Sequence, residues 1–247
     1  MKQEIRRILD VFYPRRCPVC DGIVPLFVID QNGVKEGGFI HEDCARKIRY
    51  VAGHTCMKCG KQLKSLDDSV WCSDCQRMRH HFKRNFGVFD YRRISSSIYR
   101  FKYMGRQEYA DFYADATVKR LGSRLGKLHI DGIVPVPMYG PKKAKRGYNQ
   151  AEVYAKRLSE LTGIPLYKDL VIRTRDTRPM KQLDVRGRRN NLKKAFNIAR
   201  NDVKLRCVLI IDDIYTTGST IDEIAHEFQM AGVENIYSLT LAIGQTT

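Results

Sequence analysis

The second half of the chain alternates between short apolar runs and longer segments whose apolar residues recur at helical spacing. Buried strands are predicted at 86–91, 133–137, 207–211 and 236–243. Helices are predicted at 94–103, 108–125, 150–162 and over the segment whose stripe is Ile221, Ile224, Ala225 and Phe228, closed by Gly232. Strands that alternate with helices predict an α/β domain on a mostly parallel sheet flanked by helices.

The first third of the chain has a different pattern. Residues 2–12 have the spacing of an amphipathic helix that Pro14 stops, and a cysteine-rich stretch with few apolar runs follows. We therefore divide the chain into two domains, residues 1–84 and residues 85–247. No apolar run approaches the ~18 residues of a membrane span, and the N-terminus lacks the apolar core of a signal peptide. A cytoplasmic protein without an integral membrane segment is expected.

Seven of the eight cysteines precede residue 76, and six of them form C-x-x-C pairs. The seventh, Cys44, follows His41 at the same spacing. These eight residues are enough for two tetrahedral metal sites: Cys17, Cys20, His41, Cys44, Cys56, Cys59, Cys72 and Cys75. In a chain without a signal peptide such pairs favour metal over disulfides. Gly22 and Gly60, just after two of the pairs, suit the positive-φ turn of a zinc knuckle.

Two pairings of these knuckles are open. Consecutive pairing unites the first four ligands in one site and the last four in another, which is a double zinc ribbon. A cross-braced pairing joins the first knuckle with the third, but its middle knuckles would nearly touch, and 11 residues separate Cys44 from Cys56. We expect consecutive pairing with two Zn²⁺ ions, the His41 site being the weaker of the two. Iron in a cage of four thiolates is the chemical alternative.

The chain is strongly basic, with 44 Lys and Arg against 27 Asp and Glu, a formal charge of +17. Seven thiolates remove seven charges and two Zn²⁺ ions add four, which leaves +14. Residues 173–206 alone hold 12 basic and 3 acidic side chains. This balance favours a polyanionic ligand such as nucleic acid or a phosphorylated metabolite, and a merely solvated basic surface is the alternative.

The sharpest motif runs from Val208 to Thr220. It is a buried strand that brings Asp212 and Asp213 to its carboxyl end, followed by a hydroxyl-rich loop that enters a helix. Open α/β sheets bind ligands at that edge. The loop and the helix N-terminus suit a phosphate, and adjacent carboxylates suit vicinal sugar hydroxyls, directly or beside Mg²⁺. The motif therefore predicts a site for a ribose 5-phosphate.

Two other interpretations explain this motif less well. A strand with an acidic turn and a Thr/Ser cap would not require so many matching residues. An ATPase would need a phosphate-binding G-x-x-x-x-G-K-[ST] loop, and the chain contains neither that motif nor G-x-G-x-x-G.

The 208–220 segment resembles the phosphoribosyl pyrophosphate (PRPP) motif of type I phosphoribosyltransferases. Together with the cysteine knuckles, the whole chain resembles the ComF family of competence-associated proteins. Further matching segments are 101–105, 134–137 with 145–151, and Gln182 followed by Arg188, Asn191, Ala195 and Phe196. Usual members carry a fourth C-x-x-C where this chain has His41 and Cys44. The resemblance implies a type I phosphoribosyltransferase-like sheet with a small N-terminal double zinc-ribbon domain.

The resemblance also implies roles for individual residues. Asp212 and Asp213 would hold the ribose hydroxyls, and the loop from Thr216 to Thr220 would hold the 5-phosphate. The expected PRPP-binding set is Asp212, Asp213, Tyr215, Thr216, Thr217, Gly218, Ser219, Thr220, Lys145, Arg146 and Lys102. Gln182, Arg188, Arg189 and Asn191 are expected to contact pyrophosphate or nucleic acid. No general base or nucleophile is identified.

Three classes of function stay open at this point. The first is a Mg²⁺-dependent phosphoribosyltransferase with an unknown acceptor, either in nucleotide or cofactor metabolism or reduced to PRPP binding. The second is a protein of DNA uptake and natural transformation that holds single-stranded DNA, as the family resemblance favours. The third is an interaction module whose ribbons bind a helicase or another uptake protein and whose transferase domain is inactive.

Overall fold

The computed structural model describes residues 14–30, 33–63, 69–174, 195–199 and 204–244. The helix expected at 2–12 lies outside these residues, as do Gln182, Arg188, Arg189 and Asn191. Within the described part of the chain, no helix is long and apolar enough to cross a membrane.

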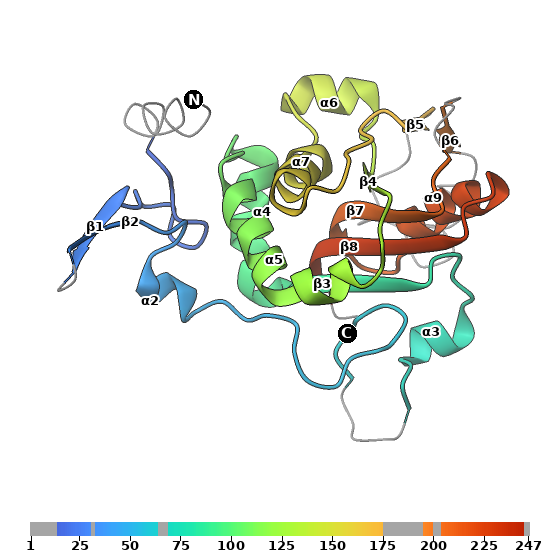
Figure 1. The fold of residues 1–247 in the computed structure, drawn as a ribbon, viewed down its shortest axis with the longest axis horizontal. Helices are drawn as coiled ribbons and strands as arrows, with labels where there is room; N and C mark the ends of the chain where they lie inside the picture. Colours follow the sequence, from blue (N-terminus) through green and yellow to red (C-terminus); the bar gives the residue numbers. More distant parts are fainter. Residues whose placement is uncertain (1–13, 31–32, 64–68, 175–194, 200–203, 245–247) are drawn as a thin grey trace.

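Four parallel strands form the central sheet (Figure 1). In spatial order they are β3 (Arg84–Asp90), β8 (Asn235–Ile243), β7 (Cys207–Tyr215) and β4 (Gly132–Pro135). β4 lies at an edge, which is where a strand tolerates the missing N–H of Pro135. Strand β7 continues four residues beyond the expected end because it pairs with β8 as far as Tyr215 and Ile243. Asp212 and Asp213 consequently belong to the last part of the strand itself.

Helices cover both faces of this sheet (Figure 1). One face carries α4 (Tyr91–Tyr103), α5 (Tyr109–Gly126) and α7 (Gln150–Thr162), and the other carries α9 (Ser219–Met230). Alternate side chains of β7 point to opposite faces of the sheet. Leu209 and Ile211 pack with α4, α5 and α7, whereas Val208 and Ile210 pack with α9. The expected mostly parallel α/β sheet with flanking helices is confirmed.

Three short elements of the α/β part were not predicted. Strands β5 (Val171–Arg173) and β6 (Phe196–Ile198) form a separate antiparallel pair of three residues each. Helix α6 (Gly140–Arg146) buries none of its residues. Strands of three residues show no periodicity, and a helix without buried residues has no apolar stripe, so neither pattern was visible in the sequence.

The cysteine-rich part contacts the α/β part at two separate places (Figure 1). The first ribbon contains the hairpin β1 (Phe27–Asp30) and β2 (Gly33–Glu36) with α2 (Glu42–Ala45), and it lies beside α4. The second contains α3 (Ser73–Arg77) and lies near α9. The connecting segment binds the edge of β3 through Val51 N, which donates to Val88 O at 2.9 Å. The boundary at residue 84 stays a prediction.

Candidate functional site: two metal centres and a cleft at the sheet edge

Two groups of four metal-ligating side chains converge in the described part of the chain. In each group the ligand atoms lie within 4.8 Å of one another: Cys17, Cys20, His41 and Cys44 in the first, and Cys56, Cys59, Cys72 and Cys75 in the second. Consecutive pairing is thereby confirmed and the cross-braced alternative is wrong. Sets of four thiolates, or three thiolates and an imidazole, fit the tetrahedral preference of Zn²⁺.

The imidazole of His41 is oriented for metal binding. Its Nε2 lies 2.9 Å from the carbonyl oxygen of Ile23, and its Nδ1 lies 3.3 Å from Sγ of Cys20. Because a carbonyl oxygen only accepts hydrogen bonds, Nε2 carries the proton and Nδ1 presents its lone pair to the three thiolates. His41 therefore fits the position that a fourth cysteine would otherwise fill.

The turns of the first and third knuckles, at Cys17–Cys20 and Cys56–Cys59, share one hydrogen-bond pattern. Cys17 N donates to Gly22 O, and Cys56 N donates to Lys61 O, both at 2.8 Å. The positive φ falls one residue after the second cysteine of each pair, at Asp21 (62°) and Gly60 (77°). The expectation for Gly60 is confirmed and that for Gly22 is wrong, because Asp21 adopts the left-handed conformation in its place.

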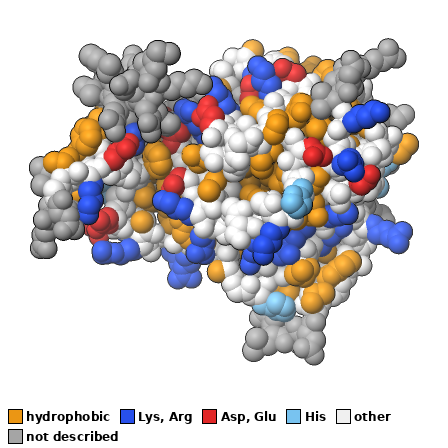
Figure 2. All heavy atoms as spheres, viewed as in Figure 1, with side chains coloured by type: hydrophobic (Ala, Val, Ile, Leu, Met, Phe, Trp, Pro, Cys, Tyr) orange, Lys and Arg blue, Asp and Glu red, His pale blue; other side chains and the backbone are white. Residues whose placement is uncertain are grey.

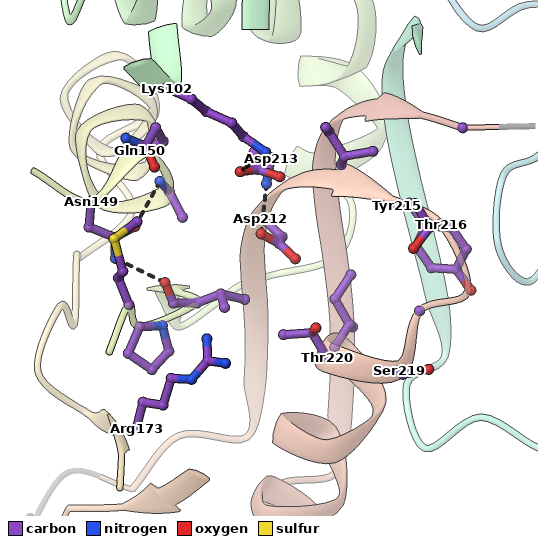
Figure 3. A pocket seen from close by; sticks show the side chains of 18 of the residues that line it. Lys102, Asn149, Gln150, Arg173, Asp212, Asp213, Tyr215, Thr216, Ser219 and Thr220 are labelled. Atoms are coloured by element: carbon purple, nitrogen blue, oxygen red, sulfur yellow. Dashed lines mark hydrogen bonds and ion pairs between the residues drawn. The ribbon is translucent and has the colours of Figure 1, made fainter. Parts of the chain in front are cut away.

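A cleft of about 530 Å³ opens at the carboxyl ends of β4 and β7 (Figure 3). It is lined from β7, the following loop and the first turn of α9, and also from α4, α6, α7 and β5. The structure brings ten of the eleven expected PRPP-site residues to this cleft: Lys102, Arg146, Asp212, Asp213, Tyr215, Thr216, Thr217, Gly218, Ser219 and Thr220.

The two acids at the end of β7 have different partners. Asp212 Oδ1 accepts a hydrogen bond from the backbone N–H of Asp213 at 2.8 Å, whereas Asp213 Oδ2 forms an ion pair of 2.7 Å with Lys102 from α4. Burial and the neighbouring charge of Asp213 raise the pKa of Asp212 to about 7. One carboxylate is thus neutralised by a lysine and the other is poised to hold a proton near neutral pH.

The loop between β7 and α9 has the form of an anion-binding turn. Gly218 has a φ of 76° and is followed by Ser219, the first residue of the 12-residue helix α9. A side chain at Gly218 would collide with the ring of Tyr215. The hydroxyls of Thr217 and Ser219 lie 2.9 Å apart. Free N–H groups of a first helical turn, with hydroxyls beside them, suit a phosphate.

Tyr215 differs from the other members of the expected set. Its side chain is only 2% exposed, and its hydroxyl packs against Gly218. Burial is the main cause that raises its pKa. The hydroxyl therefore lies beneath the loop, where it supports the backbone that a phosphate would contact.

Basic residues come to the cleft from three elements. Arg146 in α6 donates to Gln150 Oε1 at 2.7 Å, and Lys142, one turn earlier, lines the cleft with it. Lys145 is exposed and does not line the cleft. Lys142 and Arg146 are four residues apart and share one face of α6, whereas Lys145 lies on a different face. Arg173 in β5 extends from the side of the cleft opposite Lys102 (Figure 3). Lys142 and Arg173 were missed because α6 and β5 were not predicted.

The buried pair Asn149 and Gln150 forms a further wall of the cleft. Asn149 caps α7 by accepting from Ala151 N at 3.1 Å, and its Nδ2 donates to Val136 O at 2.9 Å. Both residues lie in the 145–151 segment that carries the family resemblance, but they were not expected in the site. An Asn before an apolar helix looks only like an N-cap from sequence.

The fold and the two ligand sets define an α/β protein that carries a double zinc ribbon. A family model described as a double zinc ribbon domain matches residues 8–76. Competence protein F of Haemophilus influenzae is 31% identical over 242 residues, which is 94% of this chain and 98% of that protein. The chain therefore belongs to the competence protein F (ComF) family.

More distant similarities cover less of the chain. The DNA utilization protein YhgH of Salmonella typhimurium is 31% identical over 74% of this chain and 80% of its own length. Competence protein ComFC of Bacillus subtilis is 26% identical over 72% of each. Among solved structures, a purine phosphoribosyltransferase from Pyrococcus horikoshii is similar, with a TM-score of 0.34, 23% identity and coverage of 53% of this chain and 73% of that one.

Proposed function

We propose that the cleft binds PRPP together with Mg²⁺ and that the chain acts in DNA uptake during natural transformation. The names of the relatives support the second part, because they describe competence and the utilization of DNA. The first part rests on the residues of the cleft. Gln182, Arg188, Arg189 and Asn191 stay predicted contacts of pyrophosphate or nucleic acid, and a helicase partner for the ribbons also stays a prediction.

The observation that carries the PRPP proposal is the order of charges along one cleft. The loop at the N-terminus of α9 offers a place for one phosphate, and the carboxylates of Asp212 and Asp213 come next. Lys102, Lys142 and Arg146 supply positive charge on the α4 and α6 side. A ribose with a phosphate at one end and a Mg²⁺-bound pyrophosphate at the other has the complementary sequence of groups.

Calorimetric titration of PRPP with Mg²⁺ into the zinc-loaded protein tests this proposal. We expect binding by the wild type and its loss in the double variant Asp212→Ala/Asp213→Ala. The exposed Asp169 provides a matched control, since Asp169→Ala removes a carboxylate outside the cleft. A folded wild-type protein that does not bind PRPP, or a double variant that binds it equally well, would refute the proposal.

Phosphoribosyl transfer is the reaction that such a site supports. The bond between ribose C1 and the pyrophosphate oxygen breaks, pyrophosphate leaves with the bonding electrons, and an acceptor atom forms the new bond to C1. Positioning and charge stabilisation of the leaving group supply most of the catalysis. A screen of nucleobases and other nitrogenous acceptors for pyrophosphate release separates a transferase from a protein that only binds PRPP.

Single-stranded DNA is a second candidate ligand, which a specific surface favours. Tyr99 and Tyr103 lie one turn apart on α4, 59% and 58% exposed, with ring centroids 5.0 Å apart. The guanidinium of Arg146 stacks 4.7 Å from the centroid of Tyr103 and also lines the cleft. Exposed aromatic rings beside cations are what sequence-tolerant binding of single strands uses. Figure 2 shows further Lys and Arg side chains distributed over one face of the molecule.

Fluorescence anisotropy with an oligothymidine tests this second candidate. We expect Tyr99→Ala/Tyr103→Ala to weaken binding about tenfold or more, since a stacked base is worth about 1–3 kcal/mol. Phe27→Ala, which removes a comparably exposed ring on the first ribbon, should have little effect. A plot of the logarithm of the binding constant against the logarithm of the salt concentration should have a slope of about −0.7 for each phosphate neutralised. A flat salt response would exclude this mode of binding.

A further inference from the structure

The second ribbon and the phosphate-binding loop share one hydrophobic core. Cys56, Cys59 and Cys75 are buried in the same cluster as Tyr215 and the apolar stripe of α9. The first ribbon differs, because Cys17 and Cys44 belong to a small cluster of their own. The four-cysteine site therefore lies behind the candidate ligand site and forms part of its support.

A short chain of contacts joins the four-cysteine site to the loop. Phe82 is completely buried in this core, and its ring meets that of Tyr215 edge-on at 6.3 Å between centroids. The hydroxyl of Tyr215 in turn packs against Gly218, the residue that turns the chain into α9. Phe82 and Tyr215 thus lie in the core that holds the buried cysteines, and Tyr215 reaches from that core to the backbone of the loop.

The segment that follows the last knuckle also holds α9 directly. His81 N donates to Asp222 Oδ1 at 2.6 Å, in the first turn of the helix. Gln229 Nε2, two turns further along α9, donates to the carbonyl oxygen of His81 at 3.0 Å. These bonds keep Phe82 and the first turn of α9 in register with each other.

The Cys56–Cys59 knuckle of the second ribbon is bound to the sheet on its other side. The buried Asn85 of β3 donates from Nδ2 to Cys59 O at 3.0 Å and accepts from Ser238 Oγ of β8 at 2.9 Å. Asn85 N also donates to Lys58 O at 2.8 Å. The ribbon is therefore held between the sheet and α9, and it has little freedom to move without disturbing both.

We propose that Zn²⁺ at the four-cysteine site holds the 216–220 loop in its anion-binding conformation, with Phe82 and Tyr215 as positioning residues. Metal binding at the ribbon and ribose-phosphate binding at the loop then strengthen each other. This inference deepens the proposed function and rests on it for the identity of the ligand.

The physical reason lies in how small ribbons are stabilised. A ribbon has too few apolar residues to form a core by itself, and metal ligation supplies the free energy that orders it. Without the ion, the four cysteines lose their common partner, and the core that Phe82 shares with Cys56, Cys59 and Cys75 loses its support. Tyr215 can then leave Gly218, and the N–H groups of the loop lose their common orientation. Because coupling between two binding sites is reciprocal, a ligand that binds the ordered loop more tightly must also raise the metal affinity of the ribbon.

Cobalt(II) competition on the full-length protein measures this coupling, because Co²⁺ bound by four thiolates absorbs differently from Co²⁺ bound by three thiolates and an imidazole. The Co²⁺ affinity of the four-cysteine site is measured in excess Mg²⁺ with and without ribose 5-phosphate. We expect the ligand to tighten it about tenfold, within the usual range of coupling between sites. Calorimetry of ribose 5-phosphate binding to the metal-loaded wild type and to Cys72→Ser should give the same factor.

Matched variants separate the proposed route from general destabilisation. Phe82→Leu should bring the coupling factor close to one, whereas Phe86→Leu, which truncates a buried ring in the other core cluster, should preserve it. A wild-type protein that binds ribose 5-phosphate but shows equal Co²⁺ affinity with and without it would overturn the inference and leave the proposed function intact.

Failure of the proposed function gives a different result. If the metal-loaded wild type binds neither ribose 5-phosphate nor PRPP, hydrogen exchange of the 216–220 amides decides the inference alone. Protection that falls when Zn²⁺ is removed from the four-cysteine site supports it, and unchanged protection overturns it.

Discussion

The ammonium group of Lys102 lies 2.7 Å from Oδ2 of Asp213, across the mouth of the candidate cleft. Lys102 comes from the last turn of α4 and Asp213 from the end of β7, so the pair joins two elements that are far apart in the sequence. The contact pairs one of the two adjacent carboxylates directly with an ammonium group. In the proposed function, Asp213 would hold the Mg²⁺ that accompanies the ligand, and Lys102 would then be available to a phosphate oxygen.

We expect Lys102→Met to weaken binding of Mg²⁺ and PRPP about tenfold or more. A hydrogen bond to a charged group contributes about 1.5–3 kcal/mol, and in the proposed binding mode the variant removes such a bond to the pyrophosphate. Calorimetry of the variant measures the effect. Lys119→Met is the matched control, because Lys119 forms an exposed pair with Asp115 on α5. Equal affinities for wild type and Lys102→Met would show that this lysine only balances Asp213.

The raised pKa of Asp212 predicts how stability depends on pH. Its pKa is about 7 in the folded protein, against about 4 in an unfolded chain. An acid whose pKa is raised in the folded state favours folding when it is protonated. The stability that the wild type loses through Asp212 therefore begins to appear above pH 4, grows up to pH 7 and is constant at higher pH. Without ligand, Asp212→Asn should therefore gain stability over the wild type across this range, by about 1–3 kcal/mol at pH 8.

Urea unfolding at pH 5 and pH 8 measures this difference, with Asp169→Asn as the exposed control. A gap between wild type and Asp212→Asn that stays the same at both pH values would contradict the raised pKa. Mg²⁺ and PRPP should reverse the gap at pH 8, because only the wild type then gains stability from the bound ligand.

The parts predicted from sequence are those with a strong local signal. The strand 207–211 is a continuous apolar run, and the stripe of α9 recurs at helical spacing, so the sheet and the position of the loop between β7 and α9 followed from the pattern alone. Cysteine spacing similarly predicted both metal sites. Lys142 and Arg173 were missed because β5 has only three residues and α6 buries none of its residues. The support of Gly218 by Tyr215 was not visible either, because it depends on packing between residues that sequence cannot orient.

Zinc content provides a direct test of the unusual first site. We expect two Zn²⁺ per chain in the wild type and one in Cys44→Ser, since a missing thiolate leaves three ligands. His41→Cys should retain two, because a thiolate suits the same tetrahedral position, whereas His41→Ala should retain about one. Metal analysis after gel filtration in a weak chelator gives the counts. His54→Ala is the control, since His54 lies outside both ligand sets. Two ions in His41→Ala would exclude His41 as a ligand.

The first ribbon is joined to the α/β part through Asp21, the residue with positive φ in the first knuckle. Arg106 donates to its two carboxylate oxygens from Nε and a terminal nitrogen, each at 2.8 Å, and Tyr109 donates to Oδ1 at 2.6 Å. Desolvation raises the pKa of Asp21, but the hydrogen bonds from Arg106 and Tyr109 outweigh it and lower the pKa overall. A lowered pKa stabilises the fold above the ordinary pKa of about 4 and ceases to do so as the pH falls through the folded value.

Asp21→Asn isolates this charge, because asparagine tolerates the left-handed conformation. We expect the substitution to cost about 1.5–3 kcal/mol of stability at pH 7, the range for a hydrogen bond to a charged group, and the cost to shrink as the pH falls below about 4. Denaturant unfolding of the zinc-loaded protein measures both. Asp43→Asn breaks the exposed pair with Arg46 in the same ribbon and should have almost no effect. If both variants lose the same small free energy of unfolding, the contact between Asp21 and Arg106 contributes no more than a surface ion pair. The first ribbon must then be held to the α/β part by its other bonds. The main ones are those that Arg100 donates to the carbonyl oxygens of Pro18 and Val19.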